Sequence, residues 1–322
     1  MKIENLEINN PVLVAPMAGV TDYPYRKILR EMGAELLYTE MVSAKGLVYG
    51  NQNTKDLIKL DEKAYSAVQI FGGEAKIMAK AAKIVEKNYD VDLLDINLGC
   101  PAPKIVKNNY GSALMKFPDL TKKIVKSVSK AVNIPVTVKM RKGWDEENTN
   151  AVNIAKIAEE NGAKAVAIHG RTRSEFYSGQ ADWEIIQKVK EAVNIPVVGN
   201  GDIFSEKDAE MMFEKTNCDA VMLARGIQGN PWLVKNCILT LNDQEKVEIL
   251  AEDKIKMALK HLQIAIEFYG EKRAIPLMRK HISWYLKGLS YSSEIKDKVN
   301  KSNDKNEVIE ILTNYLIFLQ NF

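Results

Sequence analysis

Short apolar segments of strand length alternate with amphipathic segments of helix length over the first three quarters of the chain. The segments between them place Ile, Val and Ala on one face, as in 76–87, 120–132 and 151–160. Thr21 or Asp22 can cap a further helix that runs to about Met32, where Gly33 can end it. Strands that are apolar throughout and alternate with helices indicate parallel strands buried on both faces. The expected strands are residues 11–17, 35–42, 65–71, 91–98, 135–140, 165–169, 196–198 and 220–224.

Eight strand–helix units of this kind fit a closed barrel. They occupy about 240 residues, close to the ~250 residues of a typical (β/α)8 TIM barrel. We therefore predict an α/β fold with such a barrel. A doubly wound open sheet is the alternative, because periodicity does not show whether the sheet closes.

The pattern changes after about Leu241, where strand signals stop and helical spacing takes over. Ile255, Leu259 and Leu262 fall on one helix face, and the apolar residues between 309 and 319 fall on another. Residues 241–245 are predicted to form the linker. The chain is thus expected to contain a barrel domain, residues 1–240, and a small all-helical C-terminal domain, residues 241–322.

Cys100 stands where the fourth apolar segment breaks. Residues 91–98 have strand character, and Gly99, Pro101 and Pro103 then interrupt them. This places a thiol on a restricted loop at a strand end, where catalytic side chains concentrate. The alternative is that Cys100 is one more small buried side chain, which is common for free cysteines.

Polar and special residues recur at or just past the carboxyl ends of the expected strands. That end of a barrel is where its enzymes build their sites. The residues concerned are Pro16, Met17, Gln69, Asn97, Cys100, Lys139, His169, Arg171, Asn200 and Arg225.

The turns after strands seven and eight carry a phosphate-binding signal. They read Gly199-Asn200-Gly201 and Ala224-Arg225-Gly226. Glycines allow close backbone approach, and arginine adds a fixed charge. Ordinary strand–helix turns, which also favour glycine, are the alternative. The first turn is not a dinucleotide fingerprint, because Phe204 replaces the third glycine.

Composition narrows the class of protein. The net charge of +3 is too small to indicate nucleic-acid binding, although a local basic face remains compatible with it. The three widely separated cysteines argue against a disulfide framework and fit a reducing cytoplasm. No spacing indicates a metal site, and neither a signal peptide nor a membrane span is visible. No protein partner is implied.

The tail carries cations beside an aromatic residue. Arg279, Lys280 and Lys287 lie around Trp284, while Pro276 is expected to interrupt the preceding helix. Cations with aromatics suit a phosphate backbone with nearby bases. A solvated face with a buried Trp is the alternative. Since positive and negative residues nearly balance in the tail, an RNA-binding face there must be local.

Taken together, the motifs resemble the tRNA-dihydrouridine synthase family, and most closely its bacterial B-type members. The resemblance covers nearly the whole chain. The motifs that carry it are Ala15–Asp22, Gln69–Gly72, Asp95–Pro101, Val138–Arg141, His169–Arg173, Tyr177–Trp183, Gly199–Ile203, Arg225–Trp232 and Arg279–His281 with Trp284 and Tyr285.

The resemblance implies a barrel that holds FMN and a helical domain that binds tRNA. The family reduces the C5–C6 bond of particular uridines, and NADPH reloads the flavin. One departure is Ala224, where family members often carry glycine.

The resemblance also implies residue roles. Cys100 is expected to be the catalytic acid that protonates C5, since a thiol keeps its proton at neutral pH. The expected cofactor site comprises Pro16, Met17, Ala18, Gln69, Lys139, His169, Asn200, Gly201, Asp202, Ala224 and Arg225. The expected tRNA contacts are Asn97, Arg141, Arg171, Arg173, Arg279, Lys280 and Lys287.

Two other functions remain open at this point. One is a barrel flavoprotein that acts on a small molecule, such as a dihydroorotate dehydrogenase-like enzyme with a similar Asn-x-x-Cys-Pro loop. It leaves the helical tail without an obvious task. The other is a non-catalytic RNA-binding module on a degenerate barrel, which would need no flavin.

Overall fold

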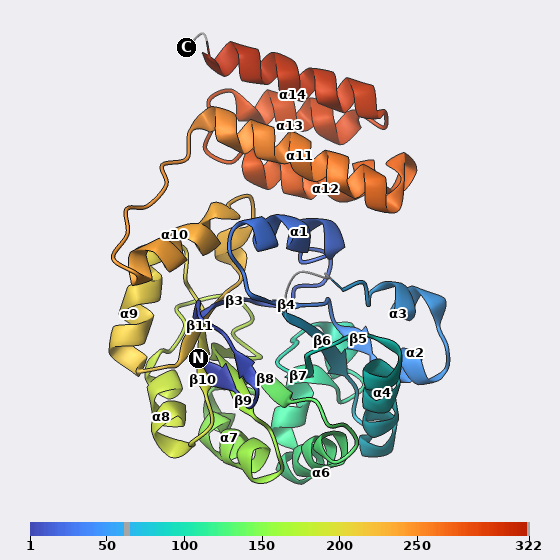
Figure 1. Cartoon of the computed structure of the whole chain (residues 1–322), viewed down its shortest axis with the longest axis vertical. Coiled ribbons are helices and arrows are strands. Elements are labelled where there is room, and N and C mark those ends of the chain that lie inside the picture. The colour runs from blue at the N-terminus through green and yellow to red at the C-terminus, as the bar shows by residue number, and fades with distance from the viewer. Residues whose placement is uncertain (61–64, 321–322) are drawn as a thin grey trace.

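The computed structural model describes residues 1–60 and 65–320, and its centre is a parallel sheet that curls into a nearly closed barrel (Figure 1). The strand order is β3-β11-β10-β9-β8-β7-β6-β4, and β5 pairs with β6 beside β4. Strand β11 pairs with β3, so the last strand returns to the first. This pairing confirms the (β/α)8 barrel and rules out the open doubly wound sheet.

The elements follow one another as expected for such a barrel. The strands are β1 (Lys2–Ile3), β2 (Leu6–Glu7), β3 (Val12–Val14), β4 (Leu36–Tyr38), β5 (Val42–Ser43), β6 (Tyr65–Phe71), β7 (Leu93–Leu98), β8 (Val136–Gly143), β9 (Ala165–Thr172), β10 (Val197–Asn200) and β11 (Ala220–Leu223). The barrel helices are α1 (Tyr23–Glu31), α2 (Ala44–Val48), α3 (Gln52–Asp56), α4 (Ala75–Asn88), α5 (Pro103–Val106), α6 (Pro118–Ser129), α7 (Ala151–Glu160), α8 (Glu184–Ala192), α9 (Glu206–Thr216) and α10 (Trp232–Leu241). Three 3-10 helices are η1 (Gly111–Lys116), η2 (Glu146–Asn148) and η3 (Arg225–Ile227), and the tail contains α11 (Ala251–Tyr269), α12 (Glu271–Tyr285), α13 (Ser292–Lys301) and α14 (Lys305–Gln320).

Most expected elements are present, with shifted ends. Strand β6 and helix α7 match their predicted bounds, and Asp22 caps α1 by accepting a hydrogen bond from the Tyr25 backbone nitrogen. The expected strand 35–42 is instead divided, because residues 39–41 leave the strand ladder between β4 and β5. Strands β8 and β9 extend beyond their predicted ends because Arg141 pairs in register with His169.

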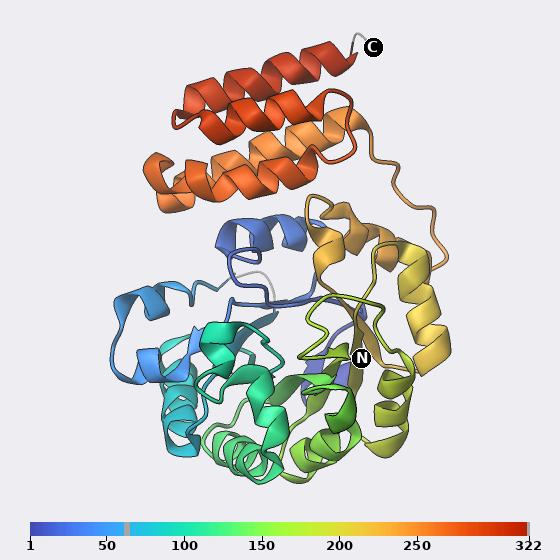
Figure 2. The ribbon, with the colours of Figure 1, turned by 180° about the vertical axis from the view of Figure 1, so that it is seen from behind.

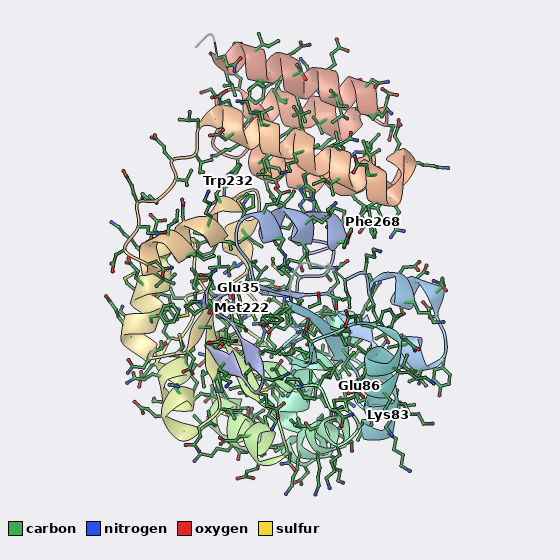
Figure 3. The ribbon with its side chains drawn as sticks, in the orientation of Figure 1. Glu35, Lys83, Glu86, Met222, Trp232 and Phe268 are labelled. Carbon is green, nitrogen blue, oxygen red and sulfur yellow. The ribbon has the colours of Figure 1, made fainter. Side chains whose placement is uncertain are left out.

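The inside of the barrel is filled by small and medium apolar side chains. Ala67, Ala165, Ala167 and Ala220 form one buried cluster with Met222, which Figure 3 labels within the barrel. The antiparallel β1–β2 hairpin joins the same cluster, with Ile3 and Leu6 buried. The interior is therefore a packed core, and the free space lies at the carboxyl ends of the strands.

The tail is a bundle of four helices on one side of the barrel (Figures 1 and 2). Residues 242–250 connect it to α10, a longer connection than the predicted 241–245. That the tail and the barrel are separate domains, divided at residue 240, stays a prediction. Pro276 lies inside α12 and does not end it, so the predicted interruption is wrong. A proline removes one backbone hydrogen bond, and the flanking turns of α12 retain theirs.

The tail docks on α1 through aromatic side chains. Tyr25 stacks on His261 at 5.1 Å between ring centroids, and its hydroxyl donates to the Ile227 carbonyl. Phe268, labelled in Figure 3, lies 4.8 Å from the ring of Tyr23. The tail thus covers the edge of the barrel next to β3 and β11. In the described part of the chain, no helix is long and apolar enough to cross a membrane.

A further contact forms at Gly229, which follows η3. A Cβ atom there would lie 2.6 Å from the backbone nitrogen of Tyr285 in α12. Gly229 also has a φ of +71°, which favours glycine. The main chains of the barrel and the tail therefore touch with no side chain between them.

Candidate active site

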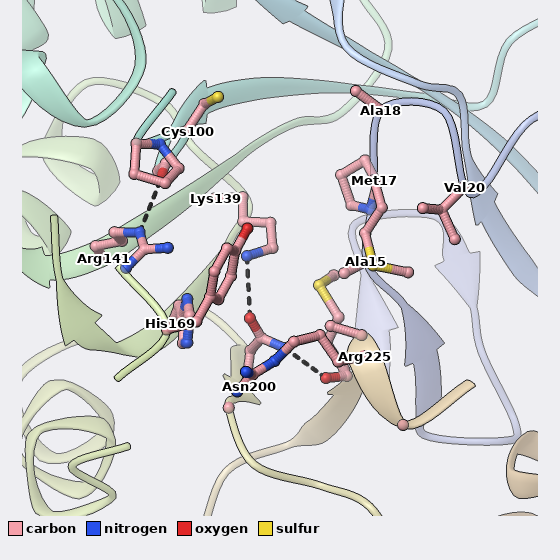
Figure 4. Close-up of a pocket in the computed structure, with 18 of the residues that line it drawn as sticks. Ala15, Met17, Ala18, Val20, Cys100, Lys139, Arg141, His169, Asn200 and Arg225 are labelled. Carbon is pink, nitrogen blue, oxygen red and sulfur yellow. Dashed lines mark hydrogen bonds between the residues drawn. The ribbon is translucent and has the colours of Figure 1, made fainter. Parts of the chain in front are cut away.

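A cavity of about 370 Å³ opens at the carboxyl ends of the strands (Figure 4). Figure 4 shows Cys100, Arg141, Lys139 and His169 on one side of it, and Met17 and Ala18 on the other. The predicted site residues that line it are Pro16, Met17, Ala18, Asn97, Cys100, Lys139, Arg141, His169, Asn200, Gly201, Asp202, Ala224 and Arg225.

A chain of buried amide groups positions the loop that carries Cys100. Asn97 accepts hydrogen bonds from the backbone nitrogens of Gly99 (3.1 Å) and Cys100 (2.9 Å). Asn97 Nδ2 donates to Gln69 Oε1 at 2.7 Å, and Gln69 Nε2 donates to Asp95 at 2.6 Å. The backbone of Cys100 is thereby fixed by side chains from β6 and β7.

The Cys100 thiol is partly buried at the edge of the cavity. Burial raises its pKa above the ordinary value, and the nearby charges of Arg141 and Lys139 offset only part of this. The group therefore carries its proton at neutral pH. A thiol held in this state can donate a proton but is a poor nucleophile.

Lys139 and His169 supply two different kinds of group to the cavity wall. The Lys139 ammonium donates to Asn200 Oδ1 at 3.1 Å, and burial lowers its pKa to about 8. Burial also lowers the pKa of His169 well below its ordinary value, and the neighbouring cations Arg141 and Lys139 lower it further. At pH 7 the cavity therefore contains a charged lysine beside a neutral imidazole.

Asp202 joins two arginines at the other end of the cavity. It accepts from Arg171 at 2.6 and 2.8 Å and from Arg225 at 2.9 Å. Burial raises its pKa, but hydrogen bonds from Arg171 and Ala181 outweigh burial and hold the pKa below its ordinary value. Because Asp202 already balances the buried Arg171, the Arg225 guanidinium supplies the positive charge that suits this end of the cavity to an anion.

Two glycines allow the turns at this end of the cavity to pack closely against neighbouring parts of the protein. A Cβ atom at Gly201, whose φ is +124°, would lie 2.7 Å from Ala181 Cβ and 3.1 Å from His169. At Gly226 it would overlap the Ile203 carbonyl and lie 2.8 Å from Leu233. Both glycines line the cavity together with Arg225, the arrangement predicted for a phosphate site.

The other predicted site residues lie outside the cavity wall. Gln69 is fully buried behind Asn97. Arg171 is 1% exposed, and its donors are used on Asp202 and on the carbonyls of Ser178 and Gly179. This burial argues against the predicted contact of Arg171 with tRNA and gives it the task of holding Asp202. Arg173 lies outside the cavity, against the ring of Trp144.

The three tail cations that were predicted to contact tRNA lie in three different environments. Arg279 donates to the Ser302 carbonyl and to Asn303, in the connection between α13 and α14. Lys280 points toward the barrel, where a Cβ atom on Gly19 would lie 3.0 Å from its ammonium. Lys287 is exposed beyond the end of α12. Of these three cations, Lys287 is exposed, whereas Arg279 and Lys280 are partly buried.

An aromatic wall was missed by reasoning from the sequence. Phe176, Tyr177 and Phe204 line the cavity and are 43%, 45% and 52% exposed. The Arg225 guanidinium lies 5.0 Å from the Tyr177 ring and 5.4 Å from the Phe204 ring. Tyr177 begins the motif Tyr177–Trp183 of the family resemblance, but that motif alone assigns it no role. Neither loop has a periodicity that would show which way its aromatic side chains point.

Comparison with known proteins agrees with this geometry. Residues 13–321 match the family model described as dihydrouridine synthase. A probable tRNA-dihydrouridine synthase of Rickettsia bellii (strain RML369-C) is 41% identical over 323 residues, covering 98% of this chain and 99% of that protein. The tRNA-dihydrouridine synthase B of Pasteurella multocida (strain Pm70) is 40% identical over 317 residues, covering 98% and 95%.

A solved structure supports the fold independently. Histamine dehydrogenase from Rhizobium sp. 4-9 superposes with a TM-score of 0.56 at 16% identity, covering 82% of this chain and 50% of that one. This likeness concerns the barrel architecture. The family match and the curated relatives extend over nearly the whole chain, and the protein belongs to the dihydrouridine synthase family.

Proposed function

We propose that this protein reduces the C5–C6 double bond of specific uridines in tRNA to dihydrouridine, with FMN as cofactor and NADPH as reductant, in the cytoplasm. The names of its relatives support the tRNA substrate. Three free cysteines, Cys100, Cys218 and Cys237, in the described part of the chain fit a reducing compartment.

The cavity suits FMN in size and in charge. Its volume of about 370 Å³ lies within the usual range for small-molecule sites. Gly201, Gly226 and Arg225 would hold the phosphate, and the apolar side chains of Met17 and Met222 would contact the ring. When bound, FMN supplies the hydride that uracil C6 receives.

Lys139 would bind the electron-rich pyrimidine edge of the flavin. Its pKa of about 8 leaves it mostly charged at pH 7, and Asn200 fixes its direction. A fixed positive charge at that edge stabilises negative charge on the ring. His169, which is neutral, would contribute a hydrogen bond without adding to the charge.

Cys100 would donate the proton that C5 of the uracil needs. The raised pKa keeps the proton on its sulfur, and the Asn97 hydrogen bonds hold its loop in place. The target uridine must leave its stack to enter the cavity, as in other enzymes that act on a base. The single observation that carries the proposal is that one cavity contains both a cationic, glycine-rich anion site and a protonated thiol.

The first test concerns the cofactor and the substrate. The purified protein is expected to be yellow and to release FMN on acid precipitation. With NADPH it is expected to form dihydrouridine, detected by mass mapping, in tRNA from cells that lack this enzyme. Release of FAD, a colourless protein that takes up no FMN, or oxidation of dihydroorotate without any action on tRNA would each overturn the proposal.

The second test separates the two half-reactions at Cys100. Cys100→Ala is expected to keep near-normal flavin reduction by NADPH, because that step needs no proton donor at C5. Reoxidation of the flavin by tRNA, followed anaerobically by stopped-flow absorbance, should slow by about 10² to 10⁴. Cys237→Ala is the matched control, since Cys237 is buried in α10 and does not line the cavity. Reoxidation within a few-fold of the parent in Cys100→Ala would show that the thiol is not the acid.

Lys280 and Lys287 would add tRNA contacts from the tail. Lys280 lies next to Gly19, in the loop that brings Met17 to the cavity, and Lys287 is exposed. A tRNA strand that passes from the tail to the cavity would run beside both lysines. Arg279 is instead assigned to the α13–α14 connection.

A further inference from the structure

Four residues form a compact surface patch at the carboxyl end of the barrel, outside the cavity. The rim patch consists of Lys116, Phe117, Trp144 and Arg173. Lys116 ends η1, while Trp144 and Arg173 directly follow β8 and β9. The two strand ends are tied together, because the backbone nitrogen of Arg173 donates to the Gly143 carbonyl at 3.0 Å.

The indole of Trp144 holds two cations close together. The Lys116 ammonium lies 4.3 Å and the Arg173 guanidinium 4.7 Å from the centre of the ring. Lys116 also lies 5.5 Å from the ring of Phe117, which is 39% exposed. Cation–π attraction fixes both charges at the base of the patch, while the ring of Phe117 stays accessible.

Neither cation is neutralised within the described residues. Lys116 and Arg173 form no ion pair there, and the Arg173 Nε atom is buried without a hydrogen-bond partner. Two carboxylates of the segment that follows Trp144 have partners outside the patch. Glu146 forms an ion pair with Lys142 at 3.1 Å, and the Asp145 carboxylate accepts a hydrogen bond from the Asn148 backbone nitrogen. Two like charges around one ring repel each other, so an anionic ligand would relieve this repulsion.

The rim patch is joined to the cavity through Arg141. This side chain lines the cavity and donates to the Gly99 carbonyl of the Cys100 loop at 2.9 Å. It also donates to the Thr172 carbonyl, next to Arg173, at 2.7 Å. Arg141 therefore links the wall of the cavity to the strand end that carries Arg173.

The rim patch lies on a different side of the barrel from the tail. The tail docks beside β3 and β11, whereas β8 is four strands away from β3 in the sheet order. Figure 1 accordingly shows α6 and α7, the neighbours of β8, at the end of the barrel farthest from the tail. The rim patch and the tail therefore lie on opposite sides of the barrel.

We propose that the rim patch is a second RNA-binding site, which holds phosphates of the strand that flanks the target uridine on the side away from the tail. Lys116 and Arg173 bind one phosphate or two neighbouring ones, Trp144 positions the two cations, and Phe117 offers a face for an unpaired base. The inference rests on the proposed function, because it takes tRNA as the substrate.

The test compares tRNA affinity over a series of salt concentrations, with oxidised protein and no NADPH. Lys116→Ala and Arg173→Ala should each weaken binding by about tenfold at low salt and reduce the salt slope by about one. Lys123→Ala is the matched control, since this exposed lysine of α6 lies outside the patch. Flavin reduction by NADPH should be unchanged in all three variants.

Trp144 needs a separate readout because it is a positioning residue. Trp144→Leu should reduce the salt slope as the cation variants do, and Trp144→Phe should restore it, with thermal stability measured for both. A loss of stability without a change in slope would show a merely structural role and overturn the assignment.

The outcomes separate this inference from the function. If the parent neither binds nor modifies tRNA, both fail. If the parent modifies tRNA but Lys116→Ala and Arg173→Ala behave like Lys123→Ala, only the rim patch assignment fails. If these two variants keep tRNA affinity but lose affinity for a polyglutamate peptide, the patch binds acidic protein and the RNA assignment is wrong.

Discussion

Replacing Asp202 by Asn should destabilise the protein far more than removing an exposed carboxylate in an equally short ion pair. Asp202 accepts two hydrogen bonds from Arg171, which is 1% exposed, and one from Arg225. Asn keeps the shape of the side chain and tolerates the φ of +55° at this position, so backbone strain does not contribute. The change leaves the buried Arg171 charge without its counter-charge.

The expected cost is about 3 kcal/mol in the free energy of unfolding. Breaking a buried ion pair by removing one partner costs about 3–5 kcal/mol, and the Asp202 side chain is 22% exposed, which favours the lower end. Asp297→Asn is the matched control. Its pair with Lys301 has the same 2.6 Å distance, but the Lys301 and Asp297 side chains are 76% and 61% exposed. That loss should be about 0.5 kcal/mol or less.

Urea unfolding of both variants, followed by circular dichroism, measures the difference. The pH dependence provides a second check. Because the pKa of Asp202 is lowered in the folded protein, its contribution is complete above the unfolded value of 3.8 and is lost as pH falls below it. The difference between the parent and Asp202→Asn should therefore shrink in acid. Equal losses in the two Asn variants at pH 7 would refute the reasoning.

Three further predictions concern single side chains. Gly201→Ala brings a Cβ to 2.7 Å from Ala181 at a φ of +124°, so it should reduce flavin content and lower the free energy of unfolding by about 1–3 kcal/mol. Gly179→Ala is the control, since Gly179 has a φ of +64° but a Cβ there would meet nothing within 4 Å, and this variant should keep the flavin. Equal loss of flavin in both variants would contradict the argument. Burial lowers the pKa of His281 from 6.5 to about 3, so between these pH values the unfolded chain binds a proton that the folded protein does not. The free energy of unfolding should therefore fall as pH drops from 6.5 toward 3, by up to ~1.4 kcal/mol per pH unit. His281→Gln should remove that part of the slope in urea titrations at several pH values, and an unchanged slope would show that the histidine is not buried neutral. Lys287→Ala should reduce the salt slope of tRNA binding by about one and leave flavin reduction by NADPH intact; unaltered affinity at low salt would exclude a phosphate contact.

The barrel could be predicted because its strands are buried on both faces and read as apolar runs. Those runs also locate the strand ends, which is why Cys100, Lys139 and Arg225 were expected at one mouth and do line one cavity. Closure could not be predicted in the same way. It depends on β11 pairing with β3, residues about two hundred positions apart, and no local pattern records that pairing.

Arg171 shows what sequence position leaves undecided at the site. The sequence position of an arginine at the end of a strand does not show whether its side chain contacts a ligand or another part of the protein. Here the loop that follows β9 folds back, and its Ser178 and Gly179 carbonyls accept from the guanidinium. Likewise, His261 and His281 lie twenty positions apart, and only the packing of α11 on α12 brings their rings to 4.6 Å.

The direct contact of main chains at Gly229 has a consequence for how members of this family can diverge. A side chain at residue 229 would meet the α12 backbone at Tyr285, and the turn that contains it begins at Arg225, in the cavity wall. Sequence changes in the tail are therefore restricted where α12 faces the barrel. Helices α13 and α14, which lie farther from the barrel (Figure 2), are freer to vary. A tail exchanged between relatives would have to be transplanted together with residues 225–229. An exchange that left this turn behind would disturb the wall of the cavity at the same time.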